Sequence, residues 1–128
     1  LVQSFHLSHI KVTMLNVKVC AAKNLVNSDN TGKSDPYAEV QVGYEYKWSD
    51  TFKTEVKSNT LDPVWNTEFS KIPTGDRYQS KLCVTVKDKD ALSMDDPLGI
   101  VEIPLKDLKK DEVQDKWYAL KLKENRSA

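Results

Sequence analysis

The chain has 128 residues, 39% of them apolar and 30% charged, which is typical of one globular domain with a real core. Nineteen basic residues balance nineteen acidic ones, so the sequence offers no overall positive field for nucleic acid. There is no apolar run long enough for a membrane span, and residues 1–12 lack the apolar stretch of a signal peptide. We expect one domain over residues 1–128 with its core at about 14–122. Because the chain begins at Leu1 rather than at a methionine, we also expect it to be a piece of a larger protein.

The cysteines and histidines do not indicate a disulfide framework or a metal site. Cys20 and Cys83 both fall in predicted strands, and two cysteines are too few to form a disulfide framework in a domain of this size. We therefore expect two free thiols and a reducing, cytoplasmic location. His6 and His9 have no acids or thiols beside them in the sequence, so we expect a surface or partly packed pair.

Alternating apolar and polar residues predict a succession of short strands. Leu15, Val17 and Val19 share one face of the clearest of these, because side chains two residues apart in a strand point the same way. One helical turn is expected at 105–110. Short strands with turn signals between them predict an all-β protein, an eight-stranded antiparallel Greek-key β-sandwich. The expected strands cover residues 2–9, 14–20, 37–42, 51–57, a short strand that follows a loop at 59–66, 82–86, 99–104 and 117–122.

Two loops, each following a strong strand, are rich in aspartate. Asp88 and Asp90 end one strand and point in the same direction, and Asp96 follows across a short loop. Two carboxylates about 5 Å apart repel by roughly 3 kcal/mol, so such crowding is tolerated where a cation supplies the missing charge. Asp29 and Asp35 lie in the other loop, and loops of a sandwich cluster at its ends. An all-oxygen site suits Ca²⁺, which takes about six to eight oxygen ligands, better than zinc or copper.

Two other interpretations of these acids fail. The first loop is not an EF-hand, because Gly32 falls at its fourth place and Val40 stands where the bidentate glutamate is needed. The Asp88-x-Asp90 pair is also found in phosphatases of the haloacid-dehalogenase type, but those need a parallel α/β core and further motifs. No arrangement of Ser, His and Asp or of Cys and His is apparent, so we expect no intrinsic catalysis.

Three ordered segments resemble motifs of the C2 domain family. They are Ser-Asp-Pro-Tyr at 34–37, Thr-Leu-Asp-Pro-Val-Trp-Asn at 60–66, and Val-Lys-Asp-Lys-Asp at 86–90 with Asp-Asp-Pro-Leu-Gly at 95–99. The resemblance extends from Leu15 to Leu122. It implies a domain that binds two or three Ca²⁺ ions at one end and docks on phospholipid membranes, recruited peripherally when calcium rises. The strand expected at 2–9 favours the family's strand order with an extra N-terminal strand.

The resemblance also implies the calcium ligands. All five of the family's ligating acids are present, together with neighbouring carbonyls and one hydroxyl. The implied set is the carboxylates of Asp29, Asp35, Asp88, Asp90 and Asp96, the carbonyls of Ser28, Lys89 and Met94, and the hydroxyl of Ser93.

The same resemblance suggests how the domain meets lipid. Leu92 and Met94 lie between Asp90 and Asp96, on the tip of the segment that resembles the family's third loop, where we expect them to enter the bilayer rather than to pack onto the loop base. Asn30 and Thr31 on the first loop tip are polar, which favours shallow insertion.

We expect the domain to bind anionic lipids in general rather than one specific head group. Many family members carry a lysine-rich sheet face, but here Glu39 and Gln41 occupy corresponding positions, leaving Tyr37 and Lys53 as weak contributors. Anionic lipid such as phosphatidylserine is therefore favoured over phosphoinositide. A protein-interaction module in which calcium is structural or incidental remains the alternative.

Overall fold

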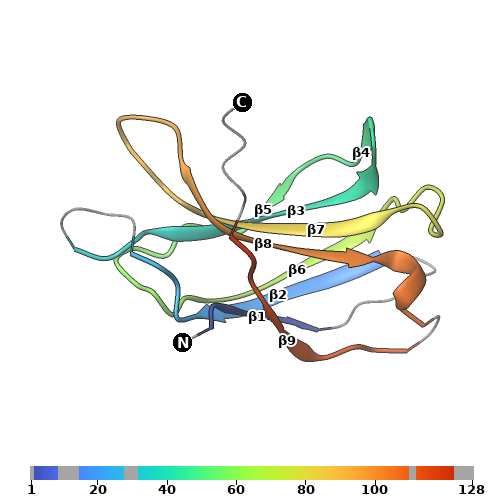
Figure 1. The fold of residues 1–128 in the computed structure, drawn as a ribbon, viewed down its shortest axis with the longest axis horizontal. Coiled ribbons are helices and arrows are strands. Elements are labelled where there is room, and N and C mark those ends of the chain that lie inside the picture. The colour runs from blue at the N-terminus through green and yellow to red at the C-terminus, as the bar shows by residue number, and fades with distance from the viewer. Residues whose placement is uncertain (1, 9–14, 28–31, 110–111, 123–128) are drawn as a thin grey trace.

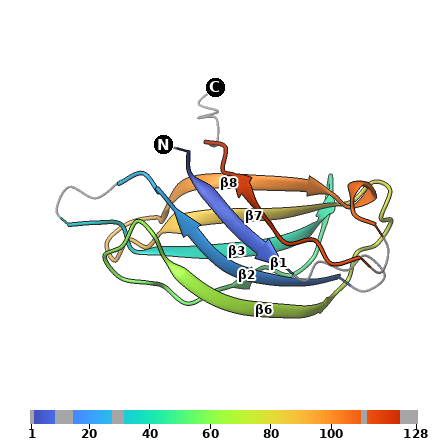
Figure 2. The ribbon, with the colours of Figure 1, turned by 90° about the horizontal axis from the view of Figure 1, so that it is seen from below.

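The computed structural model describes residues 2–8, 15–27, 32–109 and 112–122. Over these residues the chain forms two antiparallel β-sheets that pack face to face as a sandwich, with a single 3₁₀ turn (Figures 1 and 2). The elements are β1 (Ser4–Ser8), β2 (Leu15–Lys23), β3 (Pro36–Tyr44), β4 (Lys47–Trp48), β5 (Phe52–Lys53), β6 (Val64–Ile72), β7 (Lys81–Asp88), β8 (Asp96–Pro104), η1 (Leu105–Asp107) and β9 (Lys116–Ala119).

The strand order places the first and the last strand side by side in one sheet. One sheet has the order β6-β2-β1-β9, so the N-terminal strand β1 lies between β2 and the C-terminal strand β9. The other sheet has the order β4-β3-β7-β8, and β5 pairs with β3 outside this path. The expected antiparallel sandwich and its extra N-terminal strand are confirmed. No helix among the described residues is long and apolar enough to span a membrane.

The core forms where the inward faces of the two sheets meet. Leu15, Val17 and Val19 of β2 have no exposed surface, and alternate residues of β7 are buried in the same way. This alternation follows from the two-residue period of a strand, which sends every second side chain into the space between the sheets. The rings of Phe5 on β1 and Trp65 on β6, two strands of the same sheet, lie in this core with centroids 5.9 Å apart.

Some element boundaries differ from the sequence prediction. The described residues form nine strands where eight were expected, because the hairpin segment at Lys47–Trp48 pairs briefly with β3. The strand expected at 51–57 is reduced to Phe52–Lys53. Beyond it, the N–H groups of Thr54 and Lys57 still bond to carbonyls near the start of β3, but not as a regular ladder. β8 begins at Asp96 rather than at residue 99, because Asp96 pairs with Asp88.

The sulfur and imidazole groups have structural surroundings. Cys20 is buried, and it is not joined to Cys83 by a disulfide. The ring Nε2 of His6 contacts the Asp115 carboxylate, and the ring stacks on Trp117 with centroids 5.3 Å apart, as expected of a partly packed surface residue. His9 lies outside the described residues.

The sandwich core can be tested with two valines in different surroundings. Val84, in the middle of β7, has no exposed surface, whereas Val64 on β6 is 57% exposed. We expect Val84→Ala to lower the free energy of unfolding by about 2 kcal/mol, because it leaves a cavity between the sheets. Val64→Ala is the matched control, with the same loss of strand propensity and an expected change within about 0.5 kcal/mol. Urea denaturation measures both, and equal losses would contradict the described core.

Candidate metal site at the loop end

The register of three neighbouring strands brings three of the predicted acids to one end of the sandwich. Asp88, the last residue of β7, pairs with Pro36 of β3 on one side and with Asp96 of β8 on the other. Asp35 immediately precedes Pro36, and its N–H donates to Asp88 Oδ1 at 2.8 Å. Cα atoms directly opposite in an antiparallel pair lie about 4.5–5.5 Å apart. Asp35, Asp88 and Asp96 are therefore neighbours although they are far apart in sequence.

Asp88 is the least exposed of these acids. It is 2% exposed, and no other Asp, Glu, Lys or Arg in the described part of the chain is buried. A buried carboxylate is costly unless donors or cations compensate it. The N–H of Asp35 supplies one such donor.

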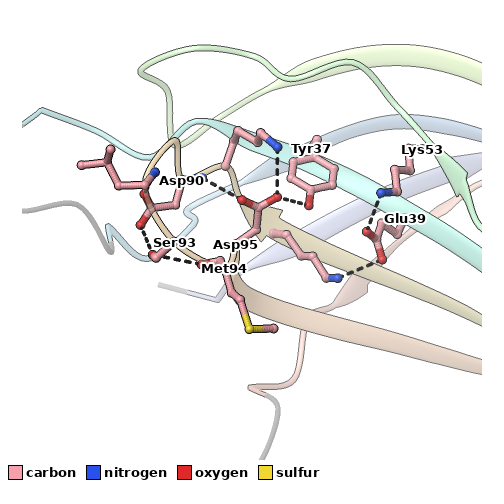
Figure 3. A network of polar contacts seen from close by, with 10 residues as sticks. Tyr37, Glu39, Lys53, Asp90, Ser93, Met94 and Asp95 are labelled. Carbon is pink, nitrogen blue, oxygen red and sulfur yellow. Dashed lines mark hydrogen bonds and ion pairs between the residues drawn. The ribbon is translucent and has the colours of Figure 1, made fainter.

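The third loop, residues 89–95, folds around the carboxylates of Asp90 and Asp95 (Figure 3). The Asp90 carboxylate accepts the Leu92 N–H at 2.9 Å and the Ser93 hydroxyl at 2.8 Å. These two donors, the Leu92 N–H first, hold the pKa of Asp90 below its usual range. A lowered pKa means that this contribution to folding is present above the ordinary carboxyl range and is lost as the pH falls through the folded value.

Asp95 has more partners than any other acid of this loop. Its Oδ1 accepts the Asp90 N–H at 2.8 Å, and its Oδ2 accepts the Tyr37 hydroxyl at 2.5 Å and lies 3.6 Å from Lys89 Nζ. The Asp90 N–H, followed by the Tyr37 hydroxyl, holds the pKa of Asp95 below its usual range. The pKa of the Tyr37 hydroxyl, which donates to Asp95, is raised, first by burial and then by its hydrogen bond to Asp95. Asp95 is not among the predicted ligands.

The second loop, residues 54–63, also contributes a residue that the sequence analysis missed. The Asn59 N–H donates to Asp35 Oδ1 at 2.7 Å, and Asn59 Oδ1 accepts the Lys33 N–H at 2.8 Å. Asn59 has φ 55°, a left-handed conformation that asparagine tolerates better than most residues. The only sequence signal was an asparagine in a turn-rich segment, which does not say which acid it would hold.

Of the remaining predicted ligands, some lie outside the described residues and others lie next to each other. The predicted ligands Ser28 and Asp29, and the predicted lipid contact Asn30, lie outside the described residues. The Ser93 hydroxyl contacts Asp90 and also lies 3.5 Å from the Met94 carbonyl, so two of the predicted oxygen donors are adjacent. In the described ranges, no group of three or more His, Cys, Asp or Glu side chains is already arranged to hold a metal ion. The donors here are oxygens, the type of ligand that calcium prefers, but among the described residues they do not form a complete ligand group.

The predicted lipid contacts fall into two classes. Leu92 is 97% exposed and Met94 is 88% exposed, so neither packs onto the loop base. In Figure 3 the Met94 side chain points away from the polar network. Tyr37 is instead 6% exposed, with its hydroxyl bound to Asp95. Lys53 is close to Glu39, whose carboxylate lies 3.6 Å from Lys53 Nζ and 3.0 Å from Lys87 Nζ.

Known proteins resemble this chain in sequence and in fold. A family model described as "C2 domain" matches residues 13–120. Synaptotagmin-4 of Arabidopsis thaliana is 38% identical over 109 residues, which are 85% of this chain and 19% of that protein. A "Calcium-dependent lipid-binding protein" of the same plant is 42% identical over 94 residues, which are 73% of this chain and 17% of that protein. The chain thus spans about a fifth of the length of these relatives.

Solved structures agree on the architecture. A C2 domain of RIM from Drosophila superposes with a TM-score of 0.78 at 23% identity, covering 94% of this chain and 99% of that one. At that identity the likeness shows the fold alone. The family model covers most of the chain and the plant relatives share more than a third of the aligned residues, so this chain belongs to the C2 domain family.

Proposed function

We propose that this domain is a calcium-dependent membrane-targeting module, which binds Ca²⁺ at its loop end and then docks on anionic phospholipid. The observation that carries the proposal is the strand register that seats the buried Asp88 between Asp35 and Asp96. A relative that bears the name calcium-dependent lipid-binding protein supports the same conclusion. The module itself needs no catalytic group.

The ligands would come from all three acidic segments at the loop end. Carboxylate oxygens would be the main donors, supplemented by carbonyls and by one hydroxyl. Bound calcium supplies positive charge and open coordination positions that lipid phosphate or carboxylate oxygens can fill. The proposed ligands are the carboxylates of Asp29, Asp35, Asp88, Asp90 and Asp96, the carbonyls of Ser28, Lys89 and Met94, and the Ser93 hydroxyl.

The charge at this end explains why docking should require the cation. Asp35, Asp88, Asp90, Asp95 and Asp96 all lie here, and Lys89 is already close to Asp95. Without a cation this end is strongly negative and is repelled by an anionic leaflet. The charge balance changes sign only when divalent ions bind, so membrane affinity and calcium affinity should be linked, each raising the other.

An apolar contribution should add to the electrostatic one. Leu92 and Met94 are almost fully exposed at the loop tip, where burial in the bilayer interface would remove their surface from water. The tip of the first loop carries the polar Asn30 and Thr31, so the proposed insertion is shallow.

Head-group selectivity should be broad because the basic groups of the sheet face are engaged within the protein. Glu39 lies between Lys53 and Lys87, and the Tyr37 hydroxyl is bonded to Asp95. A multiply charged phosphoinositide would have to compete with Glu39 for these lysines. We therefore propose phosphatidylserine-like anionic lipid as the partner, with peripheral recruitment to a cytoplasmic membrane surface when calcium rises.

Calcium binding is tested by thermal unfolding with and without excess Ca²⁺. At 100 times the dissociation constant one bound ion should stabilise the domain by about 2.7 kcal/mol, which raises the melting temperature by roughly 10 °C. The double variant Asp88→Asn/Asp90→Asn should lose this rise. Asp50→Asn/Asp107→Asn is the matched control, because it removes the same charge from exposed positions outside the loop end.

Two results would contradict calcium binding at the loop end. One is an equal rise in melting temperature in both double variants. The other is no calcium-dependent rise in the parent domain even with phosphatidylserine vesicles present. In the second case a protein-interaction module, in which calcium is structural or incidental, would become the favoured function.

The insertion of the loop tip is tested separately. We expect Leu92→Ala/Met94→Ala to weaken calcium-dependent vesicle binding by roughly tenfold, because two exposed apolar side chains no longer enter the interface. Calcium affinity measured without lipid should not change, because no side-chain ligand is altered. Val113→Ala, at a residue that is 48% exposed outside these loops, is the control. Unchanged vesicle affinity in the double variant would show that docking is purely electrostatic.

A further inference from the structure

The tip of the third loop has no apolar anchor, so polar contacts must set its position. Leu92 is 97% exposed and Met94 is 88% exposed, and neither contributes to the core. A loop without packed side chains gains its shape only from hydrogen bonds and ion pairs, and it opens easily when these are few. The bonds at the base of this loop therefore decide where Asp90 and the tip lie.

Those bonds lead to one side chain on a different strand. Tyr37 belongs to β3 and is 6% exposed, so its ring is fixed in the sheet while its hydroxyl reaches the third loop. The hydroxyl donates to Asp95 Oδ2 at 2.5 Å, and the other oxygen of Asp95 accepts the Asp90 N–H at 2.8 Å. A continuous series of contacts thus joins the rigid sheet to the backbone of Asp90 (Figure 3).

The Asp90 side chain extends this series to the tip. Its carboxylate accepts the Leu92 N–H at 2.9 Å and the Ser93 hydroxyl at 2.8 Å. Fixing the Asp90 backbone therefore also fixes the turn that holds the exposed Leu92 and Met94 outward. Lys89, 3.6 Å from Asp95, offsets the charge that Asp95 adds to an already acidic end.

We propose that Tyr37 and Asp95 are positioning residues that latch the third loop to β3, and so place Asp90 and the Leu92–Met94 tip before any ligand arrives. Neither residue need touch the metal or the lipid. The consequence for calcium binding rests on the function proposed above, whereas the latch itself is a property of the calcium-free domain. Preorganisation of this kind raises affinity because less conformational freedom is lost on binding.

The latch is tested by amide hydrogen exchange, measured by NMR on the calcium-free domain. In Tyr37→Phe and Asp95→Asn the Asp90 and Leu92 amides should exchange about tenfold faster relative to the Val84 amide in the core. Tyr118→Phe is the matched control. It also removes one buried tyrosine hydroxyl, but that hydroxyl has no hydrogen-bond partner among the described residues.

Calcium titration by calorimetry is the second readout. The two latch variants should bind Ca²⁺ about threefold or more weakly than the parent, with Tyr118→Phe unchanged. Loop exchange that does not differ between the latch variants and the control would overturn the latch. Faster loop exchange with parental calcium affinity would overturn its positioning role. If the parent binds no calcium while the exchange difference persists, the proposed function fails and the latch stands.

Discussion

The structure of the loop end depends on the pairing of β7 with its two neighbours. This register sets Asp88 beside Asp35 on one side and opposite Asp96 on the other. The inward residues of β7 are buried in the core, and a slip of one residue would turn them outward, so the core enforces the register. The packing of apolar side chains in the middle of the sandwich thereby decides where negative charge gathers at its end.

Apolar burial and polar bonds stabilise different parts of this sheet and its loops. Apolar burial fixes the strands, whereas the third loop has almost no apolar contact with the core and is shaped by polar bonds around Asp90 and Asp95. The difference suits the proposed function, because side chains that packed into the core would not be available to a membrane. Glu39 shows a related effect on the sheet face, where its contacts with Lys53 and Lys87 reduce the positive charge offered to a head group.

Much of the fold could be predicted from the sequence because its signals are local. The alternation of Leu15, Val17 and Val19 marks a half-buried strand without reference to any other part of the chain. The short strands were less accurate, since β4 and β5 exist only through brief pairing with β3, which local alternation does not report. The family assignment rested on motifs at ordered spacing, and the family match over residues 13–120 confirms it.

The site was predicted less completely, because its contacts join residues that are distant in sequence. The backbone of Asn59 holds the carboxylate of Asp35, a pairing that spans 24 positions and leaves no local pattern. Asp95 and Asp96 are adjacent and chemically identical, and only the three-dimensional register separates a residue opposite Asp88 from one bound to Tyr37. Tyr37 was expected to contribute to lipid binding, whereas its hydroxyl is occupied within the protein. The first-loop residues Ser28, Asp29 and Asn30 lie outside the described residues and stay predictions.

The most direct test of the account is sedimentation of the domain with vesicles, in a calcium buffer and in a matched buffer containing a chelator. We predict that vesicles of phosphatidylcholine and phosphatidylserine carry the domain down only when calcium is present, and that pure phosphatidylcholine vesicles do so in neither buffer. That result would follow from an acidic loop end that a divalent cation converts into a binding surface for anionic lipid. Sedimentation with phosphatidylserine vesicles that is the same in both buffers would contradict the account.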